Sequence, residues 1–208
     1  MPRLRQVSRG DAPPAVATLY ARLFGERDPV AEPGTATGTP GNWWTVFALV
    51  PDVLAHAQAG FALFNRPSSA LTPYQRELAL TRTGFARGSQ FVFSQHCKTA
   101  RRAGVPDEKL RALPAWAVSP LFDSADRALL AYADELTIAD GRVQDATFAA
   151  LRAHLSDEAI LELTYAVATY AMHATISRAL RLEYDDIDER VTEIPMPDDH
   201  GTAGGTRQ

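Results

Sequence analysis

The sequence predicts an all-α fold, a compact helical bundle. Apolar residues recur every three or four positions along most of the chain, the spacing that places them on one face of a helix. No stretch shows the alternation of β-branched and polar residues that is typical of a half-buried strand. The chain has 208 residues, 46% hydrophobic and 22% charged, which is enough to bury one core and suits one domain better than two.

Residues 1–42 are expected to form one helix followed by a long connection. The apolar stripe over residues 16–24 predicts a helix, which Gly25 is placed to end. Residues 28–41 are rich in Pro, Gly and Thr and have no period. At this length we expect either a lid over a ligand or a disordered connector.

A helical core domain is expected over residues 43–184. Asn42 can cap a first helix, and Pro51 interrupts the apolar pattern before a second helix resumes it. The clearest start signal is at Thr72, where the hydroxyl of Thr72 and the side chain of Gln75 can form a capping box. Proline at the first position of that helix loses no hydrogen bond.

Five more helices and a tail follow the one that begins at Thr72. The next helix is expected from about Ser89 to Gly104 and should run antiparallel to the helix that begins at Thr72. A short helix should end at Pro114, two others should centre on the apolar residues 129–136 and 148–151, and the longest should begin at Ser156. Residues 185–208 turn acidic and then rich in Gly and Thr, so we expect a partly disordered tail.

The charge and hydropathy patterns exclude two classes of partner. Lys and Arg number 21 against 25 Asp and Glu, a net charge of −4, so nothing favours binding to nucleic acid. No window reaches the roughly 18 apolar residues of a membrane span, and the N-terminus has no signal-peptide pattern. We therefore expect a cytoplasmic protein without a membrane partner.

Cys97 is the only cysteine, so the chain cannot form an internal disulfide, and we interpret Cys97 as a small buried residue. The five histidines show neither HxxxH nor HxH spacing, and no carboxylate spacing near them is typical of a zinc or iron site. We therefore expect neither a metal nor an organic cofactor.

Glu77 is the first candidate for acid/base chemistry. It shares a helical row with Gly84 and Gly88, so only small residues flank a carboxylate that faces either a packed helix or a pocket. Burial there is expected to raise the pKa of Glu77 towards neutrality. The alternative is a purely structural ion pair with Arg82 or Arg101.

His96 is the second candidate and shares a helix face with Ser89 and Val92. Ser89 stands at the expected helix N-terminus, where free backbone N–H groups and the helix dipole favour an anion. Two structural interpretations stay open: Ser89 can be a plain N-cap, and His96 can be a partly buried core histidine.

Residues 71–113 read LTPYQRELALTRTGFARGSQFVFSQHCKTARRAGVPDEKLRAL. The pair Arg76-Glu77 lies early in one helix and His96 lies in the next, ahead of an "AG" turn. This order and spacing resembles the core of the carboxymuconolactone decarboxylase family, which includes alkylhydroperoxidase-type enzymes. The resemblance extends over roughly residues 43–184 and implies the helical bundle of that family.

The chain departs from the peroxidase-type members at two positions. Those members carry Cys-x-x-Cys where this sequence has Ser89 and Val92. Thiol-dependent peroxide reduction needs an attacking thiolate and a resolving thiol, so we expect no such activity here. Glu77 and His96 remain, one acid/base group on each of two neighbouring helices.

The resemblance implies a cofactor-independent acid/base enzyme, a lyase or isomerase acting on a carboxylate, lactone or keto substrate. Glu77 and His96 would move the proton, and Ser89 would hold a carboxylate or enolate oxygen. The alternative is a catalytically inactive member that serves as a binding or scaffold subunit. The observation that supports this alternative is the absence of both cysteines and of the extra acidic residues that decarboxylating members carry.

The expected partners are a small-molecule substrate and further copies of the chain. Trp44, Phe93 and Tyr170 would suit a large, apolar ligand, although aromatic residues at helical spacing also form plain cores. Family members assemble into homo-oligomers, and the last helix carries apolar residues on more than one face. We therefore expect a dimer, trimer or hexamer.

Overall fold

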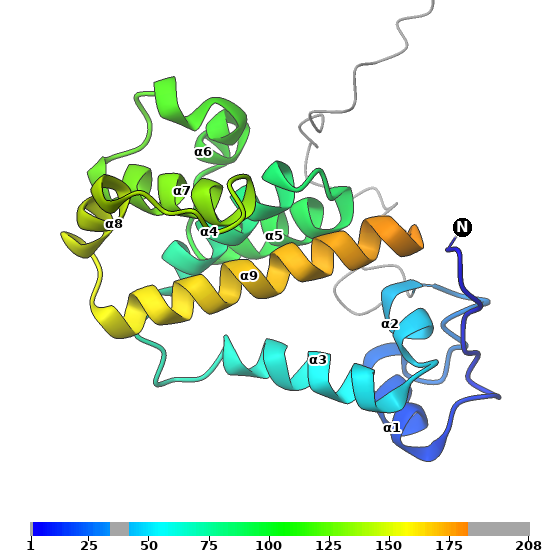
Figure 1. The fold of residues 1–208 in the computed structure, drawn as a ribbon. Coiled ribbons are helices and arrows are strands. Elements are labelled where there is room, and N and C mark those ends of the chain that lie inside the picture. The colour runs from blue at the N-terminus through cyan, green and yellow to red at the C-terminus, as the bar shows by residue number, and fades with distance from the viewer. Residues whose placement is uncertain (1, 34–41, 183–208) are drawn as a thin grey trace, which may run out of the picture.

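The computed structural model of the chain describes residues 2–33 and 42–182, and every regular element within these ranges is a helix. The all-α prediction is confirmed. In chain order the elements are α1 (Pro14–Phe24), α2 (Asn42–Phe47), α3 (Pro51–Leu63), α4 (Pro73–Ala86), α5 (Gln90–Arg102), α6 (Asp107–Ala112), the 3₁₀ helix η1 (Leu113–Val118), α7 (Ser124–Thr137), α8 (Asp145–Arg152) and α9 (Asp157–Leu180) (Figure 1).

The helix boundaries follow local signals of the sequence. The capping box is present at α4: the backbone N–H of Gln75 donates to Thr72 Oγ1 over 3.2 Å, and that of Thr72 donates to Gln75 Oε1 over 3.0 Å. Ser156 caps α9 as expected. Pro114 was predicted to end a helix, but it lies in the first turn of η1, because the missing N–H of proline costs nothing there.

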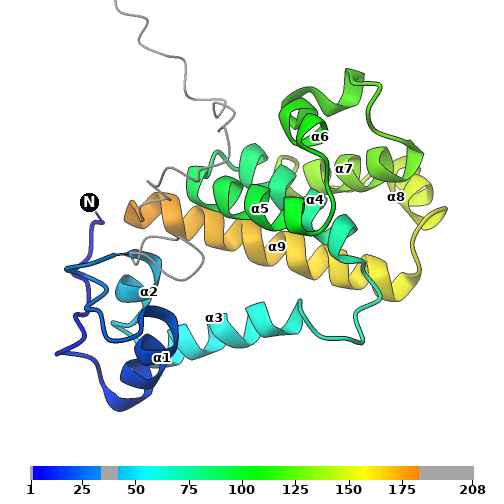
Figure 2. The ribbon, with the colours of Figure 1, turned by 180° about the vertical axis from the view of Figure 1, so that it is seen from behind.

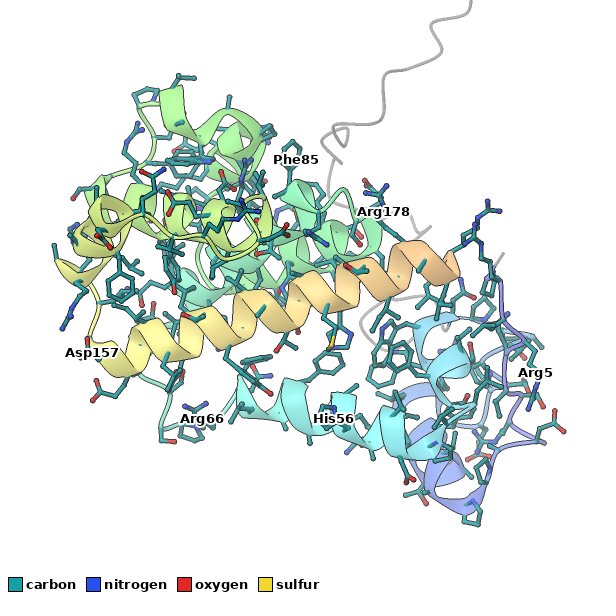
Figure 3. The ribbon with its side chains drawn as sticks, in the orientation of Figure 1. Arg5, His56, Arg66, Phe85, Asp157 and Arg178 are labelled. Carbon is teal, nitrogen blue, oxygen red and sulfur yellow. The ribbon has the colours of Figure 1, made fainter. Side chains whose placement is uncertain are left out.

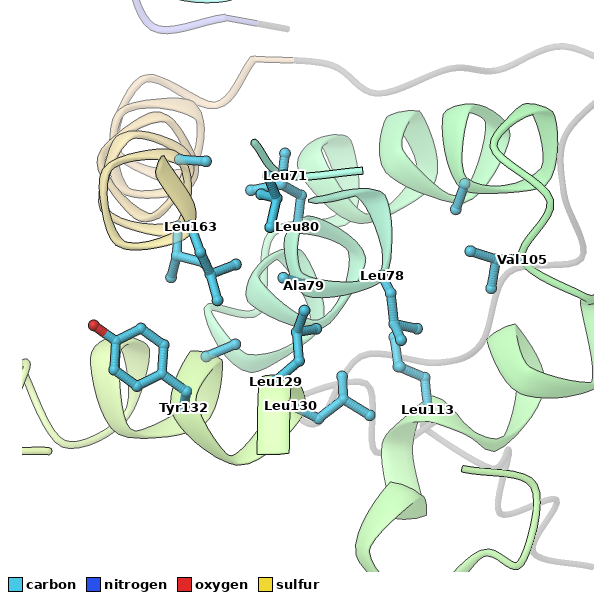
Figure 4. Close-up of a cluster of buried hydrophobic side chains, with 14 of the residues drawn as sticks. Leu71, Leu78, Ala79, Leu80, Val105, Leu113, Leu129, Leu130, Tyr132 and Leu163 are labelled. Carbon is cyan, nitrogen blue, oxygen red and sulfur yellow. The ribbon is translucent and has the colours of Figure 1, made fainter. Parts of the chain in front are cut away.

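The first of two buried clusters lies among α4, α5, α7, α8 and α9 (Figure 4). The helix α4 lies at its centre, since every residue from Glu77 to Phe85 is buried. Fully buried members include Leu78, Leu113, Leu130, Leu151 and Leu163, each 0% exposed.

The second cluster lies among the N-terminal segment, α1, α2 and the start of α3. These elements gather beside the C-terminal end of α9, while α3 runs alongside that helix (Figures 1 and 2). The backbone N–H of Arg3 donates to the carbonyl of Leu180 over 2.8 Å, which ties the chain start to the end of α9. The cluster contains Tyr20 and Trp43, so it takes side chains from both sides of the boundary expected at residue 42.

Two expected segments fall outside the description. Residues 34–41, most of the connection expected as a lid or disordered linker, are not among the described residues, and neither is the tail expected over residues 185–208. Among the helices that are described, none is both long enough and apolar enough to cross a membrane.

The helices α4 and α5 approach each other closely at Gly84. A Cβ on Gly84 would lie 2.6 Å from the backbone nitrogen of Phe93 and 2.8 Å from its Cα. Because these are backbone atoms inside a helix, they cannot turn aside as a flexible side chain can. The absence of a side chain at Gly84 therefore sets how closely the two helices pack.

We predict that Gly84→Ala destabilises the protein by about 2 kcal/mol, because the overlap with α5 outweighs the better helix propensity of alanine. Gly60→Ala is the matched control, since a Cβ on Gly60 meets nothing within 4 Å and Gly60 also lies inside a helix. That control should be neutral or stabilising by up to about 1 kcal/mol. Urea unfolding measures both, and equal effects of the two substitutions would contradict the close approach.

Candidate active site

Glu77 and His96 form a direct hydrogen bond across the α4–α5 contact. His96 Nδ1 lies 2.8 Å from Glu77 Oε2, and each residue is 6% exposed. Glu77 stands in the second turn of α4, and His96 in the middle of α5. The tight turn between the antiparallel helices brings the two side chains to the same level.

The Glu77 carboxylate is held by two further donors. Thr99, one turn beyond His96 on α5, donates its hydroxyl to Glu77 Oε2 over 2.5 Å. Arg76 donates from Nε to Glu77 Oε1 over 3.0 Å and from its terminal nitrogen to the backbone carbonyl of Phe64. Both oxygens of the carboxylate are thereby occupied.

The two arginines considered as structural partners of Glu77 bind other carboxylates. Arg82 makes a bidentate pair with Asp134, with nitrogen–oxygen distances of 2.6 and 2.9 Å. Arg101 pairs with Asp107 on the surface. Neither Arg82 nor Arg101 is therefore the partner of Glu77. The hydrogen bonds of its carboxylate are with His96, Thr99 and Arg76.

The pKa of Glu77 is lowered to about 2. Burial alone raises it, but the hydrogen bond and charge of His96, with the hydrogen bonds of Thr99 and Arg76, outweigh the cost of desolvation. The expected rise of this pKa is therefore wrong, because burial was considered without the three donors. Glu77 stays ionised near neutral pH and acts as an acceptor that orients His96 rather than as a proton donor.

A cavity of about 330 Å³ opens beside this pair, between α1, α2 and α3 on one side and α5 and α9 on the other. His96 and Thr99 form part of its wall, whereas Glu77 is not among the lining residues and contacts the cavity through them. Much of the remaining wall is aromatic and is supplied by Trp43, Trp44, Phe61, Phe91 and Tyr170.

The orientation of His96 leaves one nitrogen for a ligand. Because the ionised Glu77 can only accept, His96 Nδ1 must carry the proton of their hydrogen bond. The Tyr170 ring packs edge-on against the imidazole, with centroids 4.3 Å apart at 90°. Burial, and then the charge of Glu77, raise the pKa of Tyr170, so its phenol stays neutral. His96 Nε2 is thus the atom that can meet a molecule in the cavity.

Trp44 and Tyr170, predicted to contact a ligand, both line the cavity, but Ser89 and Phe93 do not. The Ser89 hydroxyl accepts from the backbone N–H of Val92 over 3.4 Å, so it is occupied in capping α5, and the residue is 1% exposed. Phe93 is 0% exposed and packs edge-on against Phe85, on the face of α5 that contacts α4. The roles of Ser89 as an oxygen-binding residue and of Phe93 as a ligand contact are therefore corrected.

Cys97 lies in the first buried cluster and is 1% exposed. It points away from the cavity wall formed by His96, as the 100° step between neighbouring helix positions requires. In the described part of the chain, no group of three or more His, Cys, Asp or Glu side chains is arranged to hold a metal ion.

Sequence reasoning missed His173 and three cations of the cavity wall. His173 follows Tyr170 by three positions on α9, and this spacing is the signal that could have identified it. Arg22, Lys98 and Arg102 also line the cavity. Arg22 comes from α1, far from the site in sequence, so only the tertiary structure reveals its place.

Comparisons with known proteins agree with this architecture. Residues 51–135 match the sequence model of the carboxymuconolactone decarboxylase family. The uncharacterized protein YnjA of Escherichia coli (strain K12) is 29% identical over 170 residues, covering 79% of this chain and 83% of that protein.

Two solved structures show the same fold. A peroxidase-related protein from Ralstonia eutropha JMP134, with an alkylhydroperoxidase AhpD core, superposes with a TM-score of 0.68 at 19% identity, over 88% of this chain and 95% of that chain. The debrominase Bmp8 in complex with 2,3,4-tribromopyrrole gives a TM-score of 0.66 at 17% identity, over 89% and 95% of the two chains. At these identities the likeness is one of fold alone.

The low pKa of Glu77 predicts a specific dependence of stability on pH. Its pKa lies below the ordinary value of 4.5, so its contribution is complete above that pH and is lost as pH falls towards about 2. Between about pH 6 and about pH 3, the wild type should lose about 2 kcal/mol more unfolding free energy than Glu77→Gln, which cannot titrate there. Urea unfolding at a series of pH values measures the difference, and parallel curves would show that the pKa is not lowered.

Proposed function

We propose that this chain, whose residues 51–135 match the sequence model of the carboxymuconolactone decarboxylase family, is a member of that family and a cofactor-independent acid/base enzyme acting on a small organic molecule. The observation that carries the proposal is the hydrogen bond from His96 to the ionised Glu77 at the wall of a mainly aromatic cavity. This arrangement orients one histidine nitrogen towards the space where a substrate can lie.

His96 is the general base or acid of the proposed reaction, and Glu77 is its positioning residue. The hydrogen bond to Glu77 holds the proton of neutral His96 on Nδ1, which leaves the lone pair of Nε2 for the substrate. Nε2 removes a proton from a carbon next to a carbonyl, and the electron pair of the broken C–H bond moves to the carbonyl oxygen as an enolate. The carboxylate of Glu77 stabilises the imidazolium that results.

Return of the proton completes the reaction without any oxidant or reductant. Delivery to a second carbon of the substrate gives an isomerase. A lyase would instead begin from protonated His96 and need no prior deprotonation of the substrate. CO₂ leaves, the electron pair of the broken C–C bond moves to the neighbouring carbonyl as an enolate, the carbon that lost CO₂ takes the proton from Nε2, and water then reprotonates His96. Lys98 and Arg102 line the same cavity, and their positive charges favour the enolate or carboxylate.

The residues of this chain do not support the activity of a thiol peroxidase. The positions of the peroxidase cysteines hold Ser89 and Val92, and the lone Cys97 is buried in the core. A hydroxyl cannot pass through the oxidation and disulfide steps of a thiol cycle. The proposed chemistry therefore uses only the acid/base groups.

We also propose that copies of the chain associate through α9. Leu161, Tyr165 and Met172 lie along one face of this helix at offsets of four and seven and are 70%, 50% and 47% exposed. An uncharged apolar stripe matches a second copy of itself across a twofold axis. Light scattering should give a multiple of 22.7 kDa at micromolar concentration, and the monomer mass would refute the proposal.

Proton exchange with deuterated water tests the proposed chemistry. Phenylpyruvate and an aryl-substituted β,γ-unsaturated lactone serve as probes, and NMR follows the loss of the proton next to the carbonyl. With the wild-type protein, exchange of at least one probe should exceed the buffer rate by about a hundredfold or more. His96→Ala should return it to the buffer rate, and Glu77→Gln should reduce it about tenfold or more.

Ser89→Ala is the control on the same helix. It removes the cap of α5 and should cost about 1 kcal/mol of stability while leaving exchange unchanged. If the wild-type protein exchanges neither probe faster than buffer, the enzyme proposal is contradicted. A probe that then still raised the melting temperature would favour the alternative of a binding subunit.

A further inference from the structure

We propose that His173 recognises a hydroxyl group of the ligand, and that the cavity takes a flat aromatic anion carrying such a hydroxyl. This assignment rests on the proposed function, to which it adds a substrate class and a residue that determines specificity. It is carried by the surroundings of His173, by the hydrogen-bonding capacity left over on its ring, and by the charge of the cavity wall.

His173 is enclosed by aromatic rings. Its ring centroid lies 5.1 Å from that of Phe61, 5.8 Å from Trp43 and 5.9 Å from Tyr170. The residue is 4% exposed and contributes to the cavity wall. Aromatic rings offer no strong hydrogen-bond partner, so the position would suit a phenylalanine on packing grounds alone.

The ring of His173 nevertheless carries polar capacity that the protein leaves unused. A neutral imidazole has one N–H donor and one nitrogen acceptor. Within residues 2–33 and 42–182, neither nitrogen forms a hydrogen bond, and Nδ1 is buried. A buried polar group without a partner is unfavourable, so its presence in a cavity wall indicates a group that an occupant satisfies.

The charge state of His173 selects the kind of group. Burial, followed by the electrostatic interactions with His96 on α5 and with His56 on α3, lowers the pKa of His173 to about 4. His56 is labelled in Figure 3. Near neutral pH the ring is uncharged and cannot attract an anion by its charge. A hydroxyl fits this neutral ring because it can donate to the free nitrogen or accept from the N–H.

The rest of the wall indicates an anionic, aromatic ligand. Arg22, Lys98 and Arg102 line the cavity, and no Asp or Glu is present among the lining residues that the structure describes. Arg22 and Arg102 form no ion pair with any described residue, so their charge is available to a carboxylate. The aromatic walls and the volume of about 330 Å³ suit a molecule of about two fused rings.

Calorimetry with two matched probes tests the assignment. 6-Hydroxy-2-naphthoate and 2-naphthoate differ only in the hydroxyl, and we expect the wild type to bind the hydroxylated probe about tenfold more tightly. His173→Phe keeps the ring packing and removes both nitrogens, so it should bring the two affinities to within about twofold of each other. His173→Leu provides the same comparison if the phenylalanine variant does not fold.

His154→Phe is the control, because His154 is exposed on the segment after α8 and does not line the cavity. It should keep the tenfold preference. Equal binding of both probes by the wild type, or a preference that survives loss of His173, would overturn the role of His173. Failure of both probes to bind at millimolar concentration would overturn the aromatic-anion class.

These outcomes are separable from the proposed chemistry. Calorimetry requires no turnover, whereas proton exchange depends on His96 and uses other probes. Loss of the hydroxyl preference with His96-dependent exchange intact would refute only the inference about His173. Absence of exchange with the preference intact would refute only the proposed reaction.

Discussion

The site depends on one steric constraint, the contact of α4 and α5 at Gly84. Because Gly84 has no side chain, the backbone of α5 at Phe93 can lie where a Cβ would otherwise be. This approach lets a short carboxylate side chain on α4 reach an imidazole on α5 without an intervening water. A wider separation would leave Glu77 and His96 buried but unpaired, which is the costliest state for two polar groups.

The same contact decides how the chemistry is divided between the two residues. Three donors converge on Glu77, so its carboxylate stays ionised although it is buried. In the proposed reaction its function is to hold His96 in one tautomer, and the proton transfer falls to His96 Nε2. The absence of both peroxidase cysteines leaves this pair intact, since the hydrogen bonds of the Glu77 carboxylate come from Arg76, His96 and Thr99 and not from positions 89 and 92.

Part of the cavity wall comes from outside the segment that matches the family. Residues 51–135 supply Glu77 and His96, but Trp44 precedes that segment, and Tyr170 and His173 follow it. The cavity lies where the N-terminal helices pack against α5 and α9. A shared pair of acid/base groups can therefore serve different ligands when the flanking helices change their side chains.

The sequence by itself determined the helical architecture and the composition of the proposed catalytic pair. Helical periodicity, the capping box at Thr72 and the short connection before α5 are local properties, and they place Glu77 and His96 on adjacent antiparallel helices. The single cysteine is likewise enough to exclude an intrachain thiol cycle.

Only the tertiary structure decided the charge state of Glu77, the burial of Phe93 and the place of His173 and Arg22 in the cavity. Periodicity identifies which side chains share a helix face, but not which neighbour that face meets. The pKa of Glu77 is lowered where a rise was expected for this reason, since its donor Thr99 comes from the next helix. His173 and Arg22 lie about 150 residues apart in sequence, and they line one cavity only because α1 and α9 both border it.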